Sequence, residues 1–217
     1  MDLKDIHDRL DFLGNKQANF WSPEEKDAKL HLAQMEVFNL YKAIYGKNQE
    51  ATDALSPFKV QKNFTTSDTA NGLLQFDSNY MHFLGGYIQY YDNAAARTIY
   101  QELVQVNEDE LGERLNSQLD GVSAQKPIYT TPGFGKIQLY PQQTYTGYAW
   151  YLSAPEPPKF AYTMDGREPV YNKNNSKQML WGEAQIERVI IKALQLLGVN
   201  IADSGLVQFT AAKEQQI

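Results

Sequence analysis

Hydrophobic residues near the start of the chain recur at intervals of three and four. This spacing places one apolar stripe along a helix of 3.6 residues per turn, and Gly14 with Asn15 directly after it is a typical stop signal. The sequence therefore predicts a short amphipathic helix before Gly14. The stripe consists of Leu3, Ile6, Leu10 and Leu13.

A stronger start signal follows at Ser22. Ser22 suits an N-cap, Pro23 suits the first helical position, and Glu25 completes a capping box. The helical spacing then continues through Leu30 and stops at Gly46. We expect one long helix in this part of the chain.

From about residue 58 the pattern changes to an alternation with a period of two, which is typical of half-buried strands. Runs rich in Tyr, Val, Ile and Thr alternate with clusters of Gly, Asn, Asp and Pro that favour turns. The turn signals at 67–72, 92–93 and 165–166 predict three hairpins. The predicted strands cover 58–64, 73–76, 85–91, 99–104, 127–130, 136–140, 147–152, 160–163 and 169–171.

Helical spacing returns at two later places. Asn107 and Glu110 repeat the capping pattern, which predicts an inserted helix near 107–119. A wide apolar face predicts a further helix from Trp181 to Gly198.

A last short helix is predicted after Asp203, with Leu206 and Phe209 on its apolar side. Two roles are open for it. Its apolar side can dock in a groove of a neighbouring subunit, or it can close the core of its own subunit.

The order of helices, then strands, then helices favours an α+β fold over alternating βαβ units. We expect one domain over residues 1–217, without internal repeats or a flexible linker. The terminal parts, 1–56 and 176–217, are expected to be helical and to pack together. Residues 57–175 are expected to form a central antiparallel β-sandwich or barrel-like sheet that contains the inserted helix.

The composition excludes several functional classes. Among 217 residues there is no cysteine, which excludes disulfide scaffolds, cysteine zinc sites and cysteine nucleophiles. The net charge of −6, with acids and bases interspersed, argues against broad adhesion to DNA or anionic lipid. No apolar run approaches the ~18 residues of a spanning helix, and no signal-peptide pattern opens the chain. We expect a soluble, unprocessed protein without a membrane partner.

Candidate catalytic chemistry is sparse. His7, His31 and His82 lie on three different predicted elements with no second ligand at the spacing of a helical metal site, so we expect ordinary surface or half-buried roles for them. Nucleophile elbows, phosphate-binding loops and dinucleotide motifs are absent from the sequence. Glu183 and Glu187 share a helix face, and more acids crowd the inserted helix, but solvated helix faces account for both groups. The sequence predicts no enzyme, no cofactor and no metal site.

The densest aromatic band runs from Tyr140 to Tyr151. Tyr148 and Trp150 share one side of a predicted strand, and Tyr151 points to the other. Such rings can stack on sugars, anchor a subunit interface, or pack in a core. We expect core packing or cross-strand pairing for Trp150 and interface contacts for Tyr140, Tyr148 and Tyr151. A carbohydrate-binding module that uses these four rings as a platform is the alternative.

Segments along the whole chain match a further pattern. The segments are IHDRLDFL at 6–13, SPEE at 22–25, QMEVFNLY at 34–41, DALSPF at 53–58, YMH at 80–82, NEDEL at 107–111, RLNSQ at 114–118, GKIQLYP at 135–141, LW at 180–181 and LVQF at 206–209. This pattern resembles virion structural proteins of tailed phages that infect Bacteroidetes, in particular the ring proteins of the neck and tail barrel of crAss-like phages.

The resemblance implies a non-enzymatic virion protein. Proteins of this kind combine a helical layer from both chain ends with a β-sandwich or barrel-like middle, and they form twelvefold rings beneath the portal as head-to-tail connectors. The implied partners are further copies of the chain, the portal protein, and neighbouring ring and tail proteins. DNA passes through the lumen as cargo, and there are no catalytic residues to carry over. The implied location is the virion neck or tail, after synthesis in the cytoplasm of the host bacterium.

Overall fold

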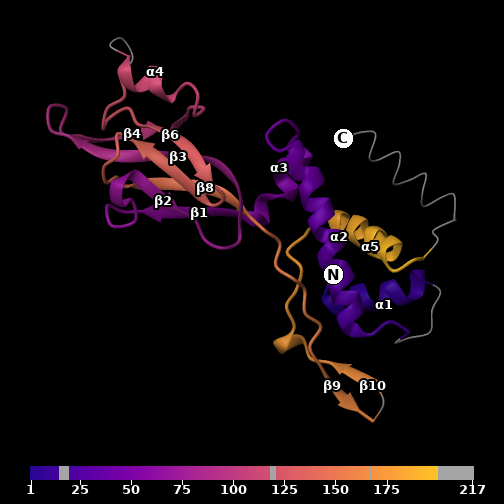
Figure 1. The fold of residues 1–217 in the computed structure, drawn as a ribbon. Helices are drawn as coiled ribbons and strands as arrows, with labels where there is room; N and C mark the ends of the chain where they lie inside the picture. The colour runs from indigo at the N-terminus through magenta and orange to yellow at the C-terminus, as the bar shows by residue number, and fades with distance from the viewer. Residues whose placement is uncertain (15–19, 118–120, 167, 200–217) are drawn as a thin grey trace. The chain divides into compact units, whose positions relative to one another are not determined.

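The computed structural model describes residues 1–14, 20–117, 121–166 and 168–199 (Figure 1). The chain divides into two units. The first contains residues 1–58 and the chain from 155 on, and the second contains Lys59–Ala154. The first unit is mainly helical and the second is built from two β-sheets, so the predicted α+β fold class is confirmed.

The first unit begins with the two helices that the spacing and caps predict. Asp2 and Asp5 form a capping box at the start of α1, and Ser22 and Glu25 form another at the start of α2. The elements of this unit are α1 (Leu3–Leu13), α2 (Pro23–Ala43), α3 (Gln49–Ala54), the 3₁₀ turn Ser56–Phe58, β9 (Tyr162–Asp165), β10 (Glu168–Tyr171), the 3₁₀ turn Lys173–Asn175 and α5 (Glu183–Leu196).

Helix α5 packs against both α1 and α2, so helices from the two ends of the chain share one core, as the sequence predicts. Burial of a Leu or Ile side chain contributes about 1.5–3 kcal/mol, and each helix contributes several such residues. The buried Leu, Ile and Val side chains are Leu3, Ile6 and Leu10 of α1, Leu30 and Val37 of α2, and Ile186, Val189, Ile190, Ile191 and Leu194 of α5.

The second unit is a sandwich of two four-stranded sheets with the strand orders β1-β8-β3-β4 and β2-β7-β6-β5. Neither sheet closes on itself within the described residues, so the sandwich alternative holds and the barrel alternative does not. The strands are β1 (Lys59–Phe64), β2 (Leu73–Gln75), β3 (Tyr80–Asp92), β4 (Arg97–Glu102), β5 (Val104–Gln105), β6 (Ile128–Gly133), β7 (Lys136–Tyr140) and β8 (Gly147–Ser153).

The connections of the sandwich correct three sequence expectations. The predicted hairpin around 67–72 is wrong: β1 pairs with β8 and β2 pairs with β7, so this loop crosses between sheets. β5 runs parallel to β6, which makes the second sheet mixed rather than antiparallel. The inserted helix α4 covers Leu111–Asn116, is shorter than the predicted 107–119, and buries none of its six residues. The hairpin of β3 and β4 is confirmed.

Thr69 explains why the loop crosses between the sheets. Its buried hydroxyl donates to the carbonyl oxygen of Tyr145 over 2.9 Å and accepts from the Tyr145 N–H over 2.7 Å. This contact, 76 residues apart in sequence, ties the loop to the start of β8. Local turn chemistry cannot reveal such a long-range partner.

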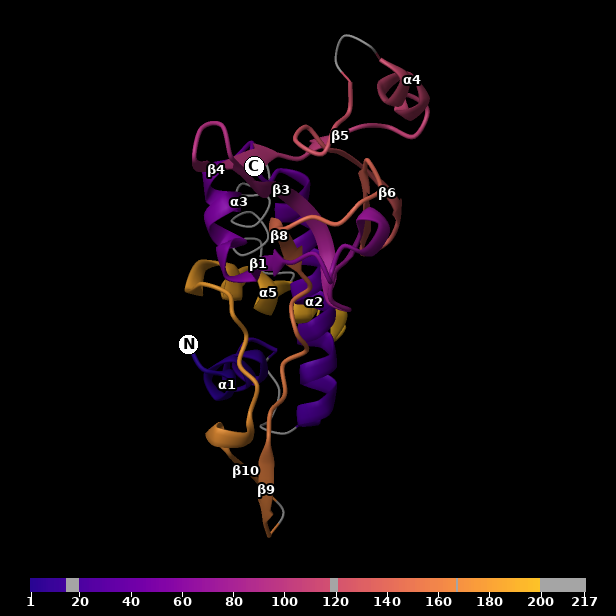
Figure 2. The same cartoon turned by 90° about the vertical axis from the view of Figure 1, so that its left-hand side faces the viewer.

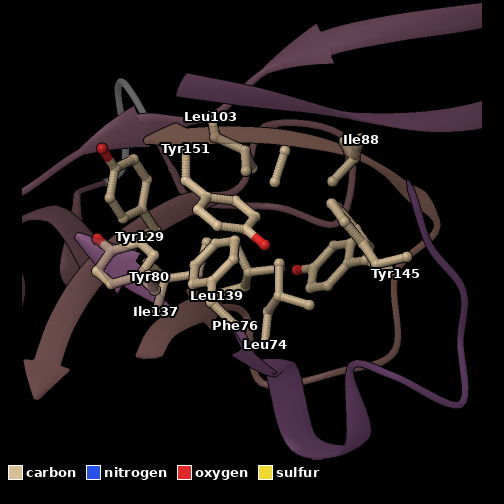
Figure 3. Packing of buried hydrophobic residues seen from close by; sticks show 12 residues of the cluster. Leu74, Phe76, Tyr80, Ile88, Leu103, Tyr129, Ile137, Leu139, Tyr145 and Tyr151 are labelled. Carbon is tan, nitrogen blue, oxygen red and sulfur yellow. The ribbon is translucent and has the colours of Figure 1, made fainter. Parts of the chain in front are cut away.

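The core of the second unit lies between the two sheets and is rich in aromatic rings (Figure 3). Both sheets contribute side chains to it, as in other sandwiches. The buried cluster consists of Phe64, Leu74, Phe76, Tyr80, Ile88, Leu103, Tyr129, Ile137, Leu139, Tyr145, Ala149 and Tyr151.

Candidate functional site

Strand β8 determines which of the predicted rings face outward. Ala149 and Tyr151 point into the sandwich core, where Tyr151 is only 1% exposed, while Tyr148 and Trp150 lie half-buried on the other side of the strand. Trp150 therefore packs against the ring of Tyr87 on the adjacent strand, outside the sandwich core, which is the cross-strand packing that the sequence allowed for it. Tyr151, expected at an interface, lies in the core.

Small residues account for this orientation. A Cβ atom on Gly147 would collide with the carbonyl oxygen of Tyr87 and would lie 2.8 Å from Cζ of Phe64. The side of β8 that carries Gly147 and Ala149 therefore accepts the large core side chains of its neighbours, and Tyr151 fills the remaining space. The opposite side has no such constraint and carries the two outward rings.

Four rings gather on the outer side of the first sheet around Tyr87 of β3. The Tyr87 ring centroid lies 5.3 Å from that of Tyr100, 5.2 Å from that of Tyr148 and 5.3 Å from that of Trp150. The rings of these three pairs are inclined to each other by 89°, 45° and 50°, respectively. We call Tyr87, Tyr100, Tyr148 and Trp150 the outer aromatic face. Three strands, β3, β4 and β8, contribute to it.

Polar side chains surround the outer aromatic face. In the strand register Gln61 lies opposite Trp150, Asn63 opposite Tyr148, and Gln89 opposite Tyr100, whereas Glu102 lies opposite Tyr87. Side chains directly opposite each other share one side of a sheet. The rings are thus bordered mainly by amides, with Glu102 on one flank and the exposed Lys59, on the same side of β1 as Gln61, on the other.

The Tyr87 phenol remains neutral at ordinary pH. Burial raises the pKa of Tyr87, and the nearby Tyr148 and Tyr100 hydroxyls raise that pKa further. A neutral phenol both donates and accepts a hydrogen bond. The face therefore combines apolar ring area with polar groups that can bind a partner, which is why Tyr is enriched at protein interfaces.

Gly85 leaves open space beside Trp150. It lies directly opposite Trp150 in the register of β3 and β8, its φ of +147° disfavours any larger residue, and a Cβ atom there would meet nothing within 4 Å. Gly85 thus adds no side chain next to Trp150, whose ring contacts that of Tyr87.

Tyr151 ties the core to a charged pair at its edge. Its hydroxyl donates to Oδ2 of Asp77 over 2.7 Å, and Nζ of Lys62 lies 3.2 Å from Oδ1 of the same carboxylate. The Tyr151 hydrogen bond and the Lys62 ammonium hold the pKa of Asp77 below its ordinary value. Burial and the Asp77 carboxylate together raise the pKa of Tyr151 to about 12. This arrangement links the buried Tyr151 ring to the Lys62–Asp77 ion pair at the edge of the core.

The remaining predicted interface residues do not join this face. Tyr140 is half-buried and alternates along β7 with the core residues Ile137 and Leu139, so it lies on the outer side of the other sheet. The predicted helix after Asp203, with Leu206 and Phe209, lies outside the described residues.

The histidines and the paired glutamates have structural partners. His7 is buried rather than half-buried, with Nε2 3.0 Å from Oδ1 of Asp27. Nδ1 of His31 lies 3.2 Å from the amide nitrogen of Gln34. Glu187 forms an ion pair with Arg9, and Glu183 lies 3.5 Å from the N-terminal ammonium group. Across the described ranges, no group of three acidic or histidine side chains could hold a metal ion.

The hairpin of β9 and β10 extends from the helical unit as a narrow arm (Figures 1 and 2). Met164 is 60% exposed on this arm and Val170 is 49% exposed. Met164 lies opposite Pro169, whereas Val170 lies opposite Thr163 on the other side of the ribbon. The sequence predicts the hairpin but gives no sign that it projects.

The chain matches no protein-family model and no curated protein sequence. In the part of the chain that the structure describes, the helices are too short or too polar to cross a membrane.

Proposed function

We propose that the protein is a non-enzymatic virion subunit that assembles into a ring in the neck or tail of a tailed phage. The observation that carries the proposal is the outer aromatic face. Four clustered rings on the outside of a sheet, bordered by amides, have the composition of a protein-contact surface. Tyr100 at the edge of this face is 60% exposed.

The resemblance to ring proteins of crAss-like phages gives the proposed assembly. In a closed ring each subunit presents two different surfaces, because heterologous contacts join neighbours head to tail. Large exposed apolar side chains occur in both units of this chain, with Tyr100 in the second unit and Met164 in the first. We propose a ring of twelve copies that lies beneath the portal and next to further ring and tail proteins.

DNA is proposed to pass through such a ring as cargo. The net charge of −6 is more compatible with a channel wall past which a polyanion moves than with a surface that binds it. Rows of phosphate-binding Lys and Arg would mark a DNA-binding face, whereas the border of the outer aromatic face consists of amides, Glu102 and the single lysine Lys59.

The inclination of the aromatic side chains favours protein contact over carbohydrate binding. A sugar platform needs exposed rings in a coplanar row, and the three ring contacts of Tyr87 are inclined by 45° to 89°. Such inclined pairs stabilise one another and leave edges, as well as faces, for a partner. Binding to a glycan array that is lost on Trp150→Ala substitution would instead support the carbohydrate-binding module.

Sedimentation velocity tests the proposed contact. We expect the wild-type protein to self-associate as its concentration rises, and we expect Tyr100→Asp to weaken this association, since it places a charge within the apolar contact. Val104→Asp is the matched control, because Val104 is 53% exposed on β5 of the other sheet. Equal self-association of Tyr100→Asp and the wild type would contradict the proposed role of this face.

A further inference from the structure

We propose that the first sheets of neighbouring copies join edge to edge in the ring, with β4 of one copy pairing with β1 of the next. This inference rests on the proposed ring assembly and names the strands that meet in it. The contact lies along the border of the outer aromatic face, so this face continues from one copy to the next.

The first sheet has two edges that are long enough to accept another strand. In the order β1-β8-β3-β4, β1 and β4 each pair with one neighbour in the part of the chain that the structure describes. Both edge strands contain six residues, whereas β2 and β5 at the edges of the second sheet contain three and two. An edge strand presents a row of N–H and C=O groups to which a further strand can bond.

Two backbone hydrogen bonds show which groups of β4 point away from the sheet. The Gln89 N–H donates to the carbonyl oxygen of Thr146 over 2.8 Å, so the backbone of Gln89 bonds toward β8 and not toward its partner Tyr100 in β4. The Leu103 N–H donates to the carbonyl oxygen of Gly86 in β3 over 2.9 Å. Backbone groups alternate in direction along a strand. The outward N–H and C=O groups of β4 are therefore those of Thr98, Tyr100 and Glu102.

The outward groups of β1 are determined in the same way. Thr146 bonds toward β3, so the next residue, Gly147, bonds toward β1, where it lies opposite Phe64. The alternation along β1 then turns the N–H and C=O groups of three residues outward. These residues are Lys59, Gln61 and Asn63.

The directions of the strands suit a head-to-tail contact. Every neighbouring pair in this sheet is antiparallel, so in a sheet of four strands the edges β1 and β4 run in opposite directions. A second copy placed in the same orientation therefore brings its β1 antiparallel to β4 and keeps its outer aromatic face on the same side. Such a contact joins two different edges, and repeated heterologous contacts of this kind close into rings.

Charge and length select one register for this contact. When the two six-residue strands overlap along their whole length, outward groups meet outward groups, and Glu102 lies opposite Lys59 of the next copy. Opposite charges directly across from each other stabilise a strand pair, and a shift by two residues in either direction removes this pair. The same register places uncharged side chains opposite each other at the two other outward positions, Tyr100 with Gln61 and Thr98 with Asn63. All six side chains are exposed.

A proline substitution tests the strand pairing. Thr98→Pro removes an outward N–H group and leaves the hydrogen bonds between β3 and β4 in place. Thr98→Ala is the matched control, since it shortens the same side chain and keeps the N–H. In sedimentation velocity we expect Thr98→Pro to weaken self-association by about tenfold or more, and Thr98→Ala to associate like the wild type. Urea unfolding of both variants checks that the hairpin of β3 and β4 is retained.

Disulfide trapping gives the decisive test, because the chain has no cysteine. Thr98→Cys and Asn63→Cys are mixed in equal amounts and oxidised, so that each molecule carries one thiol and every disulfide joins two copies. Directly opposite residues of paired strands have Cα atoms about 5.5 Å apart, within the range of a disulfide. We expect the covalent dimer of the two different variants, identified by its mass, to be the main product. In the control mixture of Thr98→Cys with Lys59→Cys the thiols lie roughly 13 Å out of register, and we expect no such preference.

The outcomes separate this inference from the proposed function. If Thr98→Pro assembles like the wild type, or if Thr98→Cys and Asn63→Cys give no more covalent heterodimer than the control mixture, the two edges do not meet and the inference is overturned. A predominant homodimer of Thr98→Cys would mean that two β4 edges meet, which also overturns it. The proposed ring assembly survives these results as long as the wild type oligomerises. A wild-type chain that stays monomeric at every concentration overturns both, and this includes the case in which a segment of the same chain covers the edge.

Discussion

Removal of the Tyr151 hydroxyl tests how the core and the outer side of the first sheet are assigned. Tyr151→Phe keeps the buried ring and deletes the donor that lies 2.7 Å from Oδ2 of Asp77. Tyr148→Phe deletes a hydroxyl three residues earlier on the same strand, on the outer side. Both variants remove one phenol hydroxyl, and they differ only in the side of β8 from which it is removed.

The magnitude follows from the environment of this hydrogen bond. A hydrogen bond to a charged group contributes about 1.5–3 kcal/mol. The Asp77 side chain is 60% exposed and keeps its contact with Lys62, so solvent screening reduces the loss to about 1–2 kcal/mol. For Tyr148→Phe we expect a change within about 0.5 kcal/mol, as for other surface substitutions.

The pH dependence gives a second signature of the same bond. The folded-state pKa of Asp77 lies below its ordinary value, so its contribution to stability is present above the unfolded pKa and is lost as pH falls through the folded pKa. Since the Tyr151 hydroxyl is the main cause of the lowered pKa, the stability difference between wild type and Tyr151→Phe should shrink below about pH 4.

Urea unfolding followed by tryptophan fluorescence measures these differences. The account predicts a lower free energy of unfolding for Tyr151→Phe at about pH 7, and a smaller gap at about pH 3. Equal stability of Tyr151→Phe and wild type at neutral pH, or a larger loss for Tyr148→Phe, would refute the orientation of β8.

Three further predictions concern the fold. Burial raises the pKa of both Tyr129 and Tyr145 to about 12. Because the unfolded chain releases these protons near pH 10, each residue should lower the free energy of unfolding by up to about 3 kcal/mol between about pH 10 and 12. Urea midpoints that do not change over this range would contradict this prediction. Gly147→Ala should cost more than about 3 kcal/mol, since its Cβ collides with backbone of β3, whereas Gly112→Ala in the open surroundings of α4 should cost nothing; thermal unfolding compares the two. Asn48→Ala should lose about 1 kcal/mol, because the Asn48 side chain caps α3 at the N–H of Ala51, and chemical denaturation that detects no loss would show that the cap is not needed.

Local signals were sufficient for the long helices and insufficient for the strand connections. The capping boxes at the starts of α1 and α2 are contained in a few adjacent residues, so spacing and caps predict these helices. Helix α3 covers only six residues, which is too short for an apolar period to show. The pairing of β1 with β8 depends on contacts such as that of Thr69 with Tyr145, which adjacent residues do not encode.

The sequence predicts two residues of the outer aromatic face, Tyr148 and Trp150, but not which side of their strand faces the core. Alternation along β8 separates Tyr148 and Trp150 from Tyr151, but both sides carry large rings, so the pattern alone does not show which side is the core. The deciding feature is the close approach of Phe64 and of the β3 backbone to Gly147. Tyr87 and Tyr100 join the face through the register of three strands, which the sequence does not reveal.

Native mass spectrometry of the wild-type chain tests the central claim most directly. The account predicts that the protein forms one closed oligomer of defined copy number, twelve by the resemblance to ring proteins, which Tyr100→Asp converts to smaller species. A protein that remains monomeric at every concentration examined, with Tyr100→Asp indistinguishable from wild type, would contradict the account.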